Sequence, residues 1–273
     1  MQYITKKNLC MGPKFGSQMT QYASLYSVAK ELDSEIVFID RYLSGFRKVE
    51  LFDAFDLPNK IIKENDLQFS TFTLKDKLID NDVFTLDKNT NWNIEGWFHT
   101  FTYFHHLEEE IRKVFKFKDY IIQEAENNIT KIKNSEPYPL VSLHVRRGDY
   151  LAVSSLNIGL SYYNNAISVF LNELKQSYFK LLIFSDDIEW CKENIQGENV
   201  FYVEDNSNYV DMHMMSLCDH HILANSSFSW WGAYLNSSKE KLVVCPFEYV
   251  NDTAHNFING SYFPSTWIPI HAV

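Results

Sequence analysis

The C-terminal half of the chain alternates short apolar runs with longer amphipathic stretches, and this pattern constrains the fold more than any other feature. Each apolar run has the length of one buried strand, and each stretch between two runs has the length of a helix. The predicted strands are residues 140–145, 180–184, 200–203, 221–224 and 241–245, and the predicted helices are residues 162–178, 188–195, 209–218 and 229–235. Strands that alternate with helices form right-handed βαβ units with a parallel sheet. The sequence therefore predicts a Rossmann-like domain in this half.

The N-terminal residues predict a second domain of similar construction. A strand, a glycine-containing loop and a helix precede an apolar run at residues 35–39. The apolar residues of the helix recur near a 3.6-residue period. Residues 41–135 mix aromatic and charged side chains, and their clearest helix covers residues 107–115. We expect an α/β protein with two Rossmann-like domains, residues 1–136 and residues 137–273.

Three segments with many polar residues follow predicted strands of the C-terminal domain. They are residues 144–150 (HVRRGDY), residues 185–187 (SDD) and residues 225–231 (NSSFSWW). In an open parallel sheet, ligands bind beyond the carboxyl ends of the strands. We therefore expect these three segments to meet in one binding site.

The first segment contains two adjacent arginines. Arg146 and Arg147 leave a buried strand, and a guanidinium group matches phosphate oxygens in geometry and charge. Gly148 permits a tight turn, and Asp149 can orient an arginine or accept a proton. Taken alone, the segment also fits a surface turn with a salt-bridged arginine. His144 favours the binding site, because a polar residue in an apolar strand needs a specific partner.

The second segment places two acids, Asp186 and Asp187, at the end of a strand. Such acids can bind a metal, hydrogen-bond a ribose or base, or cap the next helix. We expect one to be the cap and the other, Asp187, to contact the ligand. The acids are adjacent, so they do not form a DxD metal motif.

The third segment joins a strand to a helix. Backbone N–H groups and hydroxyls at a helix N-terminus bind anions. The alternative is plain N-capping by Ser227 or Ser229, with one of the two tryptophans in the core. The candidate ligand contacts here are Asn225, Ser226, Ser227, Phe228 and Ser229.

Composition excludes several functions. The net charge of −10 argues against nucleic acid as a partner. The four cysteines are scattered, as expected of free thiols in a reducing compartment. The histidines lack the spacing of a metal site, and the GxSxG and Walker motifs do not occur. The chain has no long apolar stretch, so we expect a cytoplasmic protein with at most peripheral membrane contact.

Together, three blocks resemble the α-1,2-fucosyltransferases of bacteria and animals, an inverting glycosyltransferase family (family 11). The blocks are HVRRGDY (144–150), FSDDIEWCKENI (184–195) and MSLCDHHILANSSFSWWGAYLN (215–236). The resemblance covers most of the C-terminal half. Three matching blocks in the same order are far more specific than any one of them.

The resemblance implies a GT-B-like fold, with two Rossmann-like domains facing a cleft, and transfer of fucose from GDP-fucose without a metal or other cofactor. By the same resemblance, Arg146 binds the pyrophosphate, with Arg147 beside it, and His144 and Asp187 hold the guanosine. Ser226 and Ser227 lie near the phosphates. The acceptor would be an oligosaccharide of a surface glycan, bound by the N-terminal domain. Transfer of another GDP-deoxysugar, such as colitose, and an inactive binding protein are the alternatives.

The N-terminal loop departs from the family pattern. Family members carry a loop like GGLGNQMFQYA, where this chain has PKFGSQMTQYA at residues 13–23. Gly16 and Gln18 match the pattern and are candidate acceptor or donor contacts, whereas the glycine pair and the asparagine are absent. Pro13 fixes φ and has no N–H. The difference therefore concerns the acceptor side more than the nucleotide.

Overall fold

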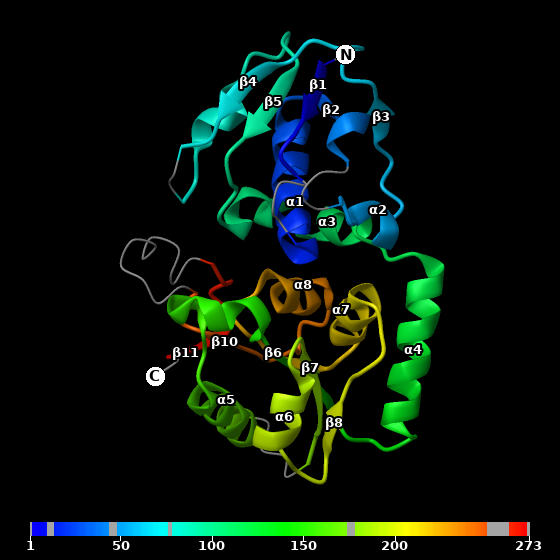
Figure 1. The fold of residues 1–273 in the computed structure, drawn as a ribbon, viewed down its shortest axis with the longest axis vertical. Coiled ribbons are helices and arrows are strands. Elements are labelled where there is room, and N and C mark those ends of the chain that lie inside the picture. The colour runs from blue at the N-terminus through cyan, green and yellow to red at the C-terminus, as the bar shows by residue number, and fades with distance from the viewer. Residues whose placement is uncertain are drawn as a thin grey trace. The chain divides into compact units, whose positions relative to one another are not determined.

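The computed structural model describes residues 2–9, 14–43, 48–75, 78–173, 178–249 and 262–271. The chain divides into two compact units, Met1–Lys118 and Asp119–Val273, and each has its own parallel sheet (Figure 1). The division falls ahead of helix α4 (Asp119–Lys133), which packs against α7 (Asn208–Ser216). The sequence placed the boundary between residues 136 and 137, after this helix. Its packing on α7 explains why α4 belongs to the second unit.

The first unit is built on a five-stranded sheet in the order β3-β2-β1-β5-β4, with parallel pairings. The strands are β1 (Gln2–Thr5), β2 (Ser34–Ile39), β3 (Lys60–Ile62), β4 (Ser70–Thr73) and β5 (Trp92–Glu95). The described helices are α1 (Phe15–Glu31), α2 (Leu51–Ala54) and α3 (Glu108–Val114). The predicted strand, helix and strand at the start of the chain are present as β1, α1 and β2. Strands β3 and β4 are short and largely exposed, so they lack the apolar signature of a buried strand.

The second unit is a six-stranded parallel sheet in the order β11-β10-β9-β6-β7-β8. The strands are β6 (Leu140–Val145), β7 (Lys180–Ser185), β8 (Val200–Tyr202), β9 (His220–Ile222), β10 (Val243–Pro246) and β11 (Ile268–Ile270). The helices between them are α5 (Leu160–Glu173), α6 (Ile188–Asn194), α7 and α8 (Ser227–Leu235). In chain order this is the Rossmann arrangement 3-2-1-4-5-6, so the strand order reverses between β6 and β9. A crevice for a ligand is expected beyond the carboxyl ends of these two strands.

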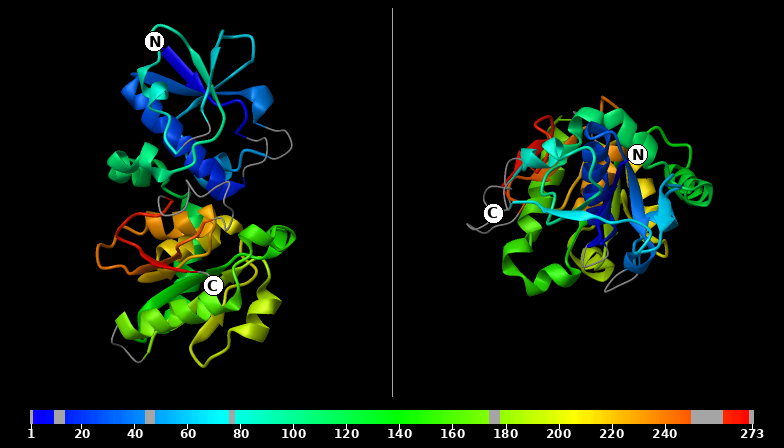
Figure 2. Two further views of the ribbon diagram at one scale, coloured as in Figure 1. Left: turned by 90° about the vertical axis from the view of Figure 1, so that its left-hand side faces the viewer. Right: turned by 90° about the horizontal axis from the view of Figure 1, so that it is seen from above.

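Side chains of β6 alternate between the two faces of this sheet. Val141, Leu143 and Val145 belong to the core cluster that contains the buried face of α5. Ser142 and His144 point to the opposite face, where the ring of His144 lies 5.3 Å from that of Phe228 on α8. Helices α5 and α8 accordingly lie on opposite sides of the sheet (Figure 2, left). The alternation therefore brings His144 to the helix that follows β9.

A buried polar network fixes α8 to the sheet. Oγ of Ser142 lies 2.8 Å from Nδ1 of His221, and Nδ2 of Asn236, just after α8, lies 3.0 Å from Nε2. Burial holds the pKa of His221 well below its ordinary value, and the positive charges of Lys241 and His220 lower it further. The ring is therefore neutral. Because Asn236 donates to Nε2, the ring proton is on Nδ1 and is donated to Ser142. The network ties β6, β9 and the end of α8 together.

Asp211 on α7 provides a test of stability against pH. Burial raises the pKa of this carboxyl to about 6, although the hydrogen bond from Asn206 (3.0 Å) lowers it. The folded protein thus binds the proton more tightly than the unfolded chain, whose value is 3.8. The protonated carboxyl therefore contributes its full stabilisation below pH 3.8, and this stabilisation is lost as pH rises through about 6.

Asp211→Asn keeps the acceptor oxygen and removes the charge. It should raise the free energy of unfolding at pH 7.5 by about 1–2 kcal/mol, since the side chain is only partly buried.

Urea unfolding at pH 4 and pH 7.5 measures this effect. The exposed Glu198→Gln is the matched control and should leave stability unchanged at both pH values. A gain for Asp211→Asn that is equal at the two pH values would contradict the assignment.

Candidate functional site

The two arginines at the end of β6 turn toward different acids. Nη1 of Arg146 lies 2.6 Å from Oδ2 of Asp186, and Nη2 lies 2.6 Å from Oδ1 of Asp149. The guanidinium group lies over the ring of Tyr150, 5.2 Å from its centroid. Its side chain is 16% exposed, so it is held firmly but not sealed from solvent. These two contacts engage two of the five N–H donors of the group, which leaves capacity for a ligand.

Arg147 forms the second half of this arrangement. Its Nε donates to Oδ2 of Asp187 at 2.9 Å, and its guanidinium group lies 4.0 Å from the ring centroid of Trp190 on α6. Its backbone N–H donates to Oδ1 of Asp186 at 2.9 Å. The salt-bridged turn that was the alternative to a binding site is therefore present. The salt bridges orient the guanidinium groups at the carboxyl edge of the sheet, and their contact with a ligand stays a prediction.

The turn after Arg147 depends on the absence of a side chain at Gly148. A Cβ atom placed there would overlap Oδ2 of Asp186 and lie 3.1 Å from its Cγ. No positive φ angle is involved, so the requirement is one of space and not of backbone conformation. Gly148 therefore lets the arginine loop pass close to the end of β7.

The two acids after β7 have different roles from those expected. Asp187 is the N-cap of α6, where its Oδ1 accepts from the N–H of Trp190 at 3.4 Å, and its other oxygen binds Arg147. Asp186 binds Arg146 and the backbone of Arg147 instead of capping the helix. The prediction that Asp187 is the acid that does not cap the helix is wrong. Its contact with a ligand stays a prediction.

His144 is buried at the same edge of the sheet. Burial and, to a smaller extent, the positive charge of Arg146 lower the pKa of its imidazole to about 3. Its Nδ1 has no hydrogen-bond partner among the described residues. A neutral imidazole both donates and accepts a hydrogen bond. It can therefore recognise a polar heterocycle without adding charge.

The segment after β9 begins with a buried asparagine. Nδ2 of Asn225 donates to the carbonyl oxygens of Leu156 and Tyr249, both at 2.9 Å. Its Oδ1 is buried and has no partner in the part of the chain that the structure describes. Asn225 thus joins the end of β9 to the loop after Gly148 and to the segment after β10.

The start of α8 differs in one detail from the prediction. The N-cap is Ser226, whose Oγ accepts from the N–H of Phe228 at 3.3 Å, and not Ser227 or Ser229. Ser229 donates to the carbonyl oxygens of Ala224 and Ser226. Trp230 and Trp231 are both buried, whereas only one was expected in the core.

Two tyrosines complete the site and were not predicted. The hydroxyl of Tyr150 donates to the carbonyl of Asn225 at 3.3 Å, and it shares a hydrogen bond with Tyr249. Burial raises the pKa of both hydroxyls, so both stay protonated. Tyr150 belongs to the arginine loop, but only the charged residues of that loop were predicted as ligand contacts. Tyr249 lies far along the chain in a segment without any motif, so no sequence signal identifies it.

Gly16 and Gln18 lie in the first unit, within α1. Gln18 is buried, and its side-chain amide donates to the carbonyl of Lys48 at 2.9 Å and accepts from the N–H of Glu50 at 2.7 Å. It therefore holds the chain around residues 48–50, and a contact with a ligand stays a prediction for both residues. Within the described ranges, no three His, Cys, Asp or Glu side chains gather as metal ligands. No described helix is long and apolar enough to cross a membrane.

The chain resembles several known proteins in sequence and in fold. A family model described as glycosyl transferase family 11 matches residues 3–271. An alpha-1,2-colitosyltransferase of Escherichia coli is 29% identical over 93% of this chain and 95% of its own. A galactoside alpha-(1,2)-fucosyltransferase 1 of Bos taurus is 27% identical over 81% of this chain and 64% of its own. The crystal structure of the fucosyltransferase NodZ from Bradyrhizobium has a TM-score of 0.54 at 14% identity, over 85% of this chain and 92% of that one. The predicted fold class, α/β with two Rossmann-like units of the GT-B type, is confirmed.

Proposed function

We propose that this chain, which belongs to glycosyl transferase family 11, moves L-fucose from GDP-fucose to a hydroxyl group of an acceptor glycan. The position of Arg146 is the observation that carries the proposal. Its guanidinium group stands at the carboxyl end of β6, where the strand order of a Rossmann sheet reverses and nucleotides bind. The names of the relatives support an α-1,2 linkage, and we propose galactose as the acceptor sugar.

The nucleotide contacts follow from the charges and polar groups at this edge. We assign the pyrophosphate to Arg146, with Arg147 beside it and the N-terminus of α8 at Ser226 and Ser227 as a second source of positive potential. Two arginines and three aspartates give the unliganded site a net charge of −1. We assign the guanosine to the neutral imidazole of His144 and to Asp187. Phe228, next to His144, would cover the base, and Asn225 and Ser229 would hold the backbone around it.

The transfer inverts the configuration of the anomeric carbon. The acceptor oxygen forms a bond to that carbon while the bond between the carbon and the β-phosphate oxygen breaks. The electron pair of the broken bond stays on GDP, and the proton of the acceptor hydroxyl passes to water. Negative charge therefore grows on the β-phosphate, and an arginine there stabilises the transition state more than the ground state. We propose that the protein performs this step without a bound metal.

Asp149 is proposed to position Arg146. Its Oδ1 lies 2.6 Å from Nη2 of that residue, and its side chain is 53% exposed. Asp149→Asn should lower kcat about 10-fold at every pH, because an amide oxygen holds the guanidinium group more weakly than a carboxylate does. The dependence of kcat on pH, measured for the wild type and for this variant, tests the prediction. Loss of the acidic limb of the profile would instead identify Asp149 as the general base.

Transfer of colitose is the second candidate. The observation in its favour is the alpha-1,2-colitosyltransferase, which resembles this chain over nearly the whole length of both proteins. The ratio of kcat/KM for GDP-fucose to that for GDP-colitose, with the same galactose-terminated acceptor, decides between the two sugars.

The proposed function is tested with GDP-fucose and galactose-terminated oligosaccharides. We expect release of GDP together with a fucosylated product, and titration calorimetry should give a lower Kd for GDP than for UDP. A preference for UDP would contradict the assignment of the nucleotide. Tight binding of GDP without hydrolysis or transfer would identify the protein as a binding relative.

We assign acceptor recognition to the first unit and propose a cytoplasmic enzyme. The described cysteines, Cys191, Cys218 and Cys245, are free and buried, which supports a reducing compartment.

A further inference from the structure

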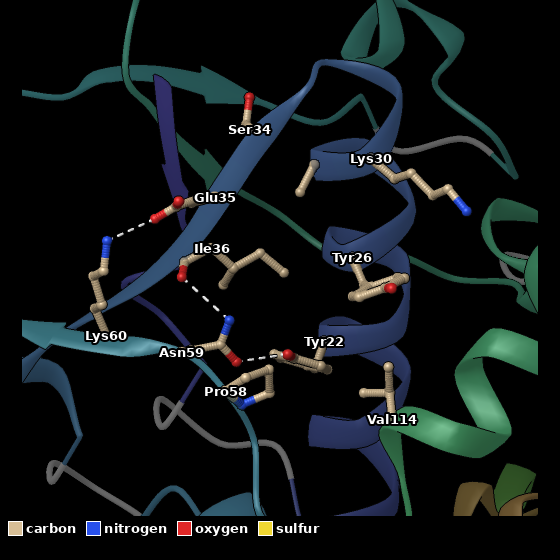
Figure 3. Close-up of a pocket in the computed structure, with 11 residues that line it drawn as sticks. Tyr22, Tyr26, Lys30, Ser34, Glu35, Ile36, Pro58, Asn59, Lys60 and Val114 are labelled. Carbon is tan, nitrogen blue, oxygen red and sulfur yellow. Dashed lines mark hydrogen bonds and ion pairs between the residues drawn. The ribbon is translucent and has the colours of Figure 1, made fainter. Parts of the chain in front are cut away.

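A pocket of about 460 Å³ lies in the first unit between α1 and the strands β2 and β3 (Figure 3). Its volume is within the range of about 300–1,000 Å³ that is usual for small-molecule sites. Its lining residues all belong to the first unit, whereas the arginine loop belongs to the second. The pocket is therefore not part of the nucleotide site.

The pocket is also separate from the ligand edge of its own sheet. It is lined by Ser34, Glu35 and Ile36, which are the first three residues of β2, and by Lys60, the first residue of β3. These are the amino ends of parallel strands. Rossmann-like sheets bind substrates at the opposite, carboxyl ends. The usual position of a ligand in such a sheet therefore does not account for this pocket.

Two tyrosines on one face of α1 form one side of the pocket. Tyr22 is 1% exposed, and its ring stacks on that of Phe38 at 6.1 Å. Its hydroxyl donates to Oδ1 of Asn59 at 2.6 Å, and Nδ2 of Asn59 donates to the carbonyl of Ile36 at 3.2 Å. Tyr26, one turn later on the same face of α1, is only partly buried. Figure 3 shows both tyrosines on the helix, with Ile36, Pro58 and Asn59 opposite them. The pocket therefore combines aromatic and apolar surface with an amide whose orientation is fixed in advance.

The charges at the rim of the pocket neutralise one another. Nζ of Lys60 lies 2.9 Å from Oε2 of Glu35, and Nζ of Lys30 lies 2.6 Å from Oε2 of Glu110. An anion would have to compete with these carboxylates, so the pocket does not favour a phosphate or a nucleotide. It favours a neutral ligand with an apolar face and several hydroxyl groups. A sugar ring has this chemistry, since its C–H face packs on aromatic rings and its hydroxyls reach the polar rim.

We propose that this pocket is a second saccharide-binding site, which holds a neutral segment of a glycan away from the group that is transferred. That the glycan is the acceptor rests on the proposed function, whereas binding of the saccharide does not. Holding a long acceptor at two places raises its effective concentration at the reactive site. Loss of the pocket should therefore raise KM for long acceptors and leave KM for short ones and kcat unchanged.

Titration of the full chain with lacto-N-tetraose, without any nucleotide, tests the binding. In amide NMR spectra, signals of residues 22–36 and 58–60 should shift with a Kd on the order of millimolar. Tyr26→Ala should raise the Kd obtained from these shifts at least 5-fold. Tyr26→Phe should leave the Kd unchanged, because the ring remains. Tyr120→Ala, at an exposed tyrosine of the second unit, is the matched control and should have no effect.

An amide NMR spectrum that matches the wild type for residues of the first unit outside 22–36 and 58–60 shows that each variant is folded, and binding of GDP shows the same for the second unit. Shifts confined to residues elsewhere, an unchanged Kd for Tyr26→Ala, or displacement of the saccharide by inorganic phosphate would each overturn the proposal. Failure of the proposed function would appear separately, as saccharide binding without any transfer from GDP-fucose.

Discussion

Replacing Arg146 with alanine is expected to lower kcat for transfer from GDP-fucose by about 10²–10³-fold. The guanidinium group is held by Asp149 and Asp186, 2.6 Å away on each side, at the end of β6. A donor that is oriented before the reaction does not have to reorganise when charge develops on the β-phosphate. The β-phosphate carries more negative charge in the transition state than in the bound substrate, so the guanidinium group of Arg146 binds the transition state more strongly. Its loss should therefore affect kcat more than KM.

The same substitution should leave the protein folded. Arg146 and its partners lie beyond the end of the strand, and Asp149 keeps contact with solvent when the arginine is removed. Three aspartates would then face one arginine, so the net charge of the site would change from −1 to −2. We therefore expect GDP to bind about 10-fold more weakly, which corresponds to about 1.4 kcal/mol.

Steady-state kinetics and titration calorimetry with GDP measure the two effects. Arg146→Lys keeps the charge but loses the planar fork, so its kcat should lie between those of the wild type and the alanine variant. Arg41→Ala is the matched control, since Arg41 is also paired with a carboxylate, Glu64, but lies outside the site. A folded Arg146→Ala protein with near-wild-type kcat would refute the role assigned to this residue.

The sequence predicts the second unit well because burial leaves a clear pattern there. Strands β6 and β7 are buried along almost their whole length, and their sequences, LVSLHV and KLLIFS, are therefore mostly apolar. Strand β11 was not predicted, since it has three residues with Pro269 in the middle. Strands β3 and β4 were missed for a related reason, because exposed strands have no apolar run to detect. The pattern thus identifies strands only where the core requires them.

The location of the site could be predicted more fully than the roles within it. The carboxyl ends of parallel strands meet at one edge, so three separate polar turns had to converge. Which acid caps α6 and which serine caps α8 depends on the backbone direction of each turn, and adjacent residues such as Asp186 and Asp187 offer the same chemistry. Tyr249 reaches the site through the packing of a distant segment, which leaves no local pattern.

Gly148→Ala is expected to lower kcat/KM by about 10²-fold through steric effects alone. A methyl group at this position would overlap Oδ2 of Asp186, so the carboxylate has to move. Asp186 holds both the guanidinium group of Arg146 and the N–H of Arg147. A displacement of about 1 Å at a group that orients the reacting centre can cost this much. The backbone at Gly148 is open to alanine, so the fold should be unchanged.

A double-mutant cycle isolates the cause. Asp186→Ala removes the atom with which the new methyl group collides, so adding Gly148→Ala to this variant should have no further effect on kcat/KM. Gly159→Ala is the matched control, because a Cβ atom there would lie 3.5 Å from Oγ of Ser161, an ordinary contact, and its activity should equal that of the wild type. If Gly148→Ala lowered kcat/KM by the same factor with and without Asp186, the loss would come from the backbone of the loop. The close approach of Gly148 to Asp186 would then not be what orients Arg146.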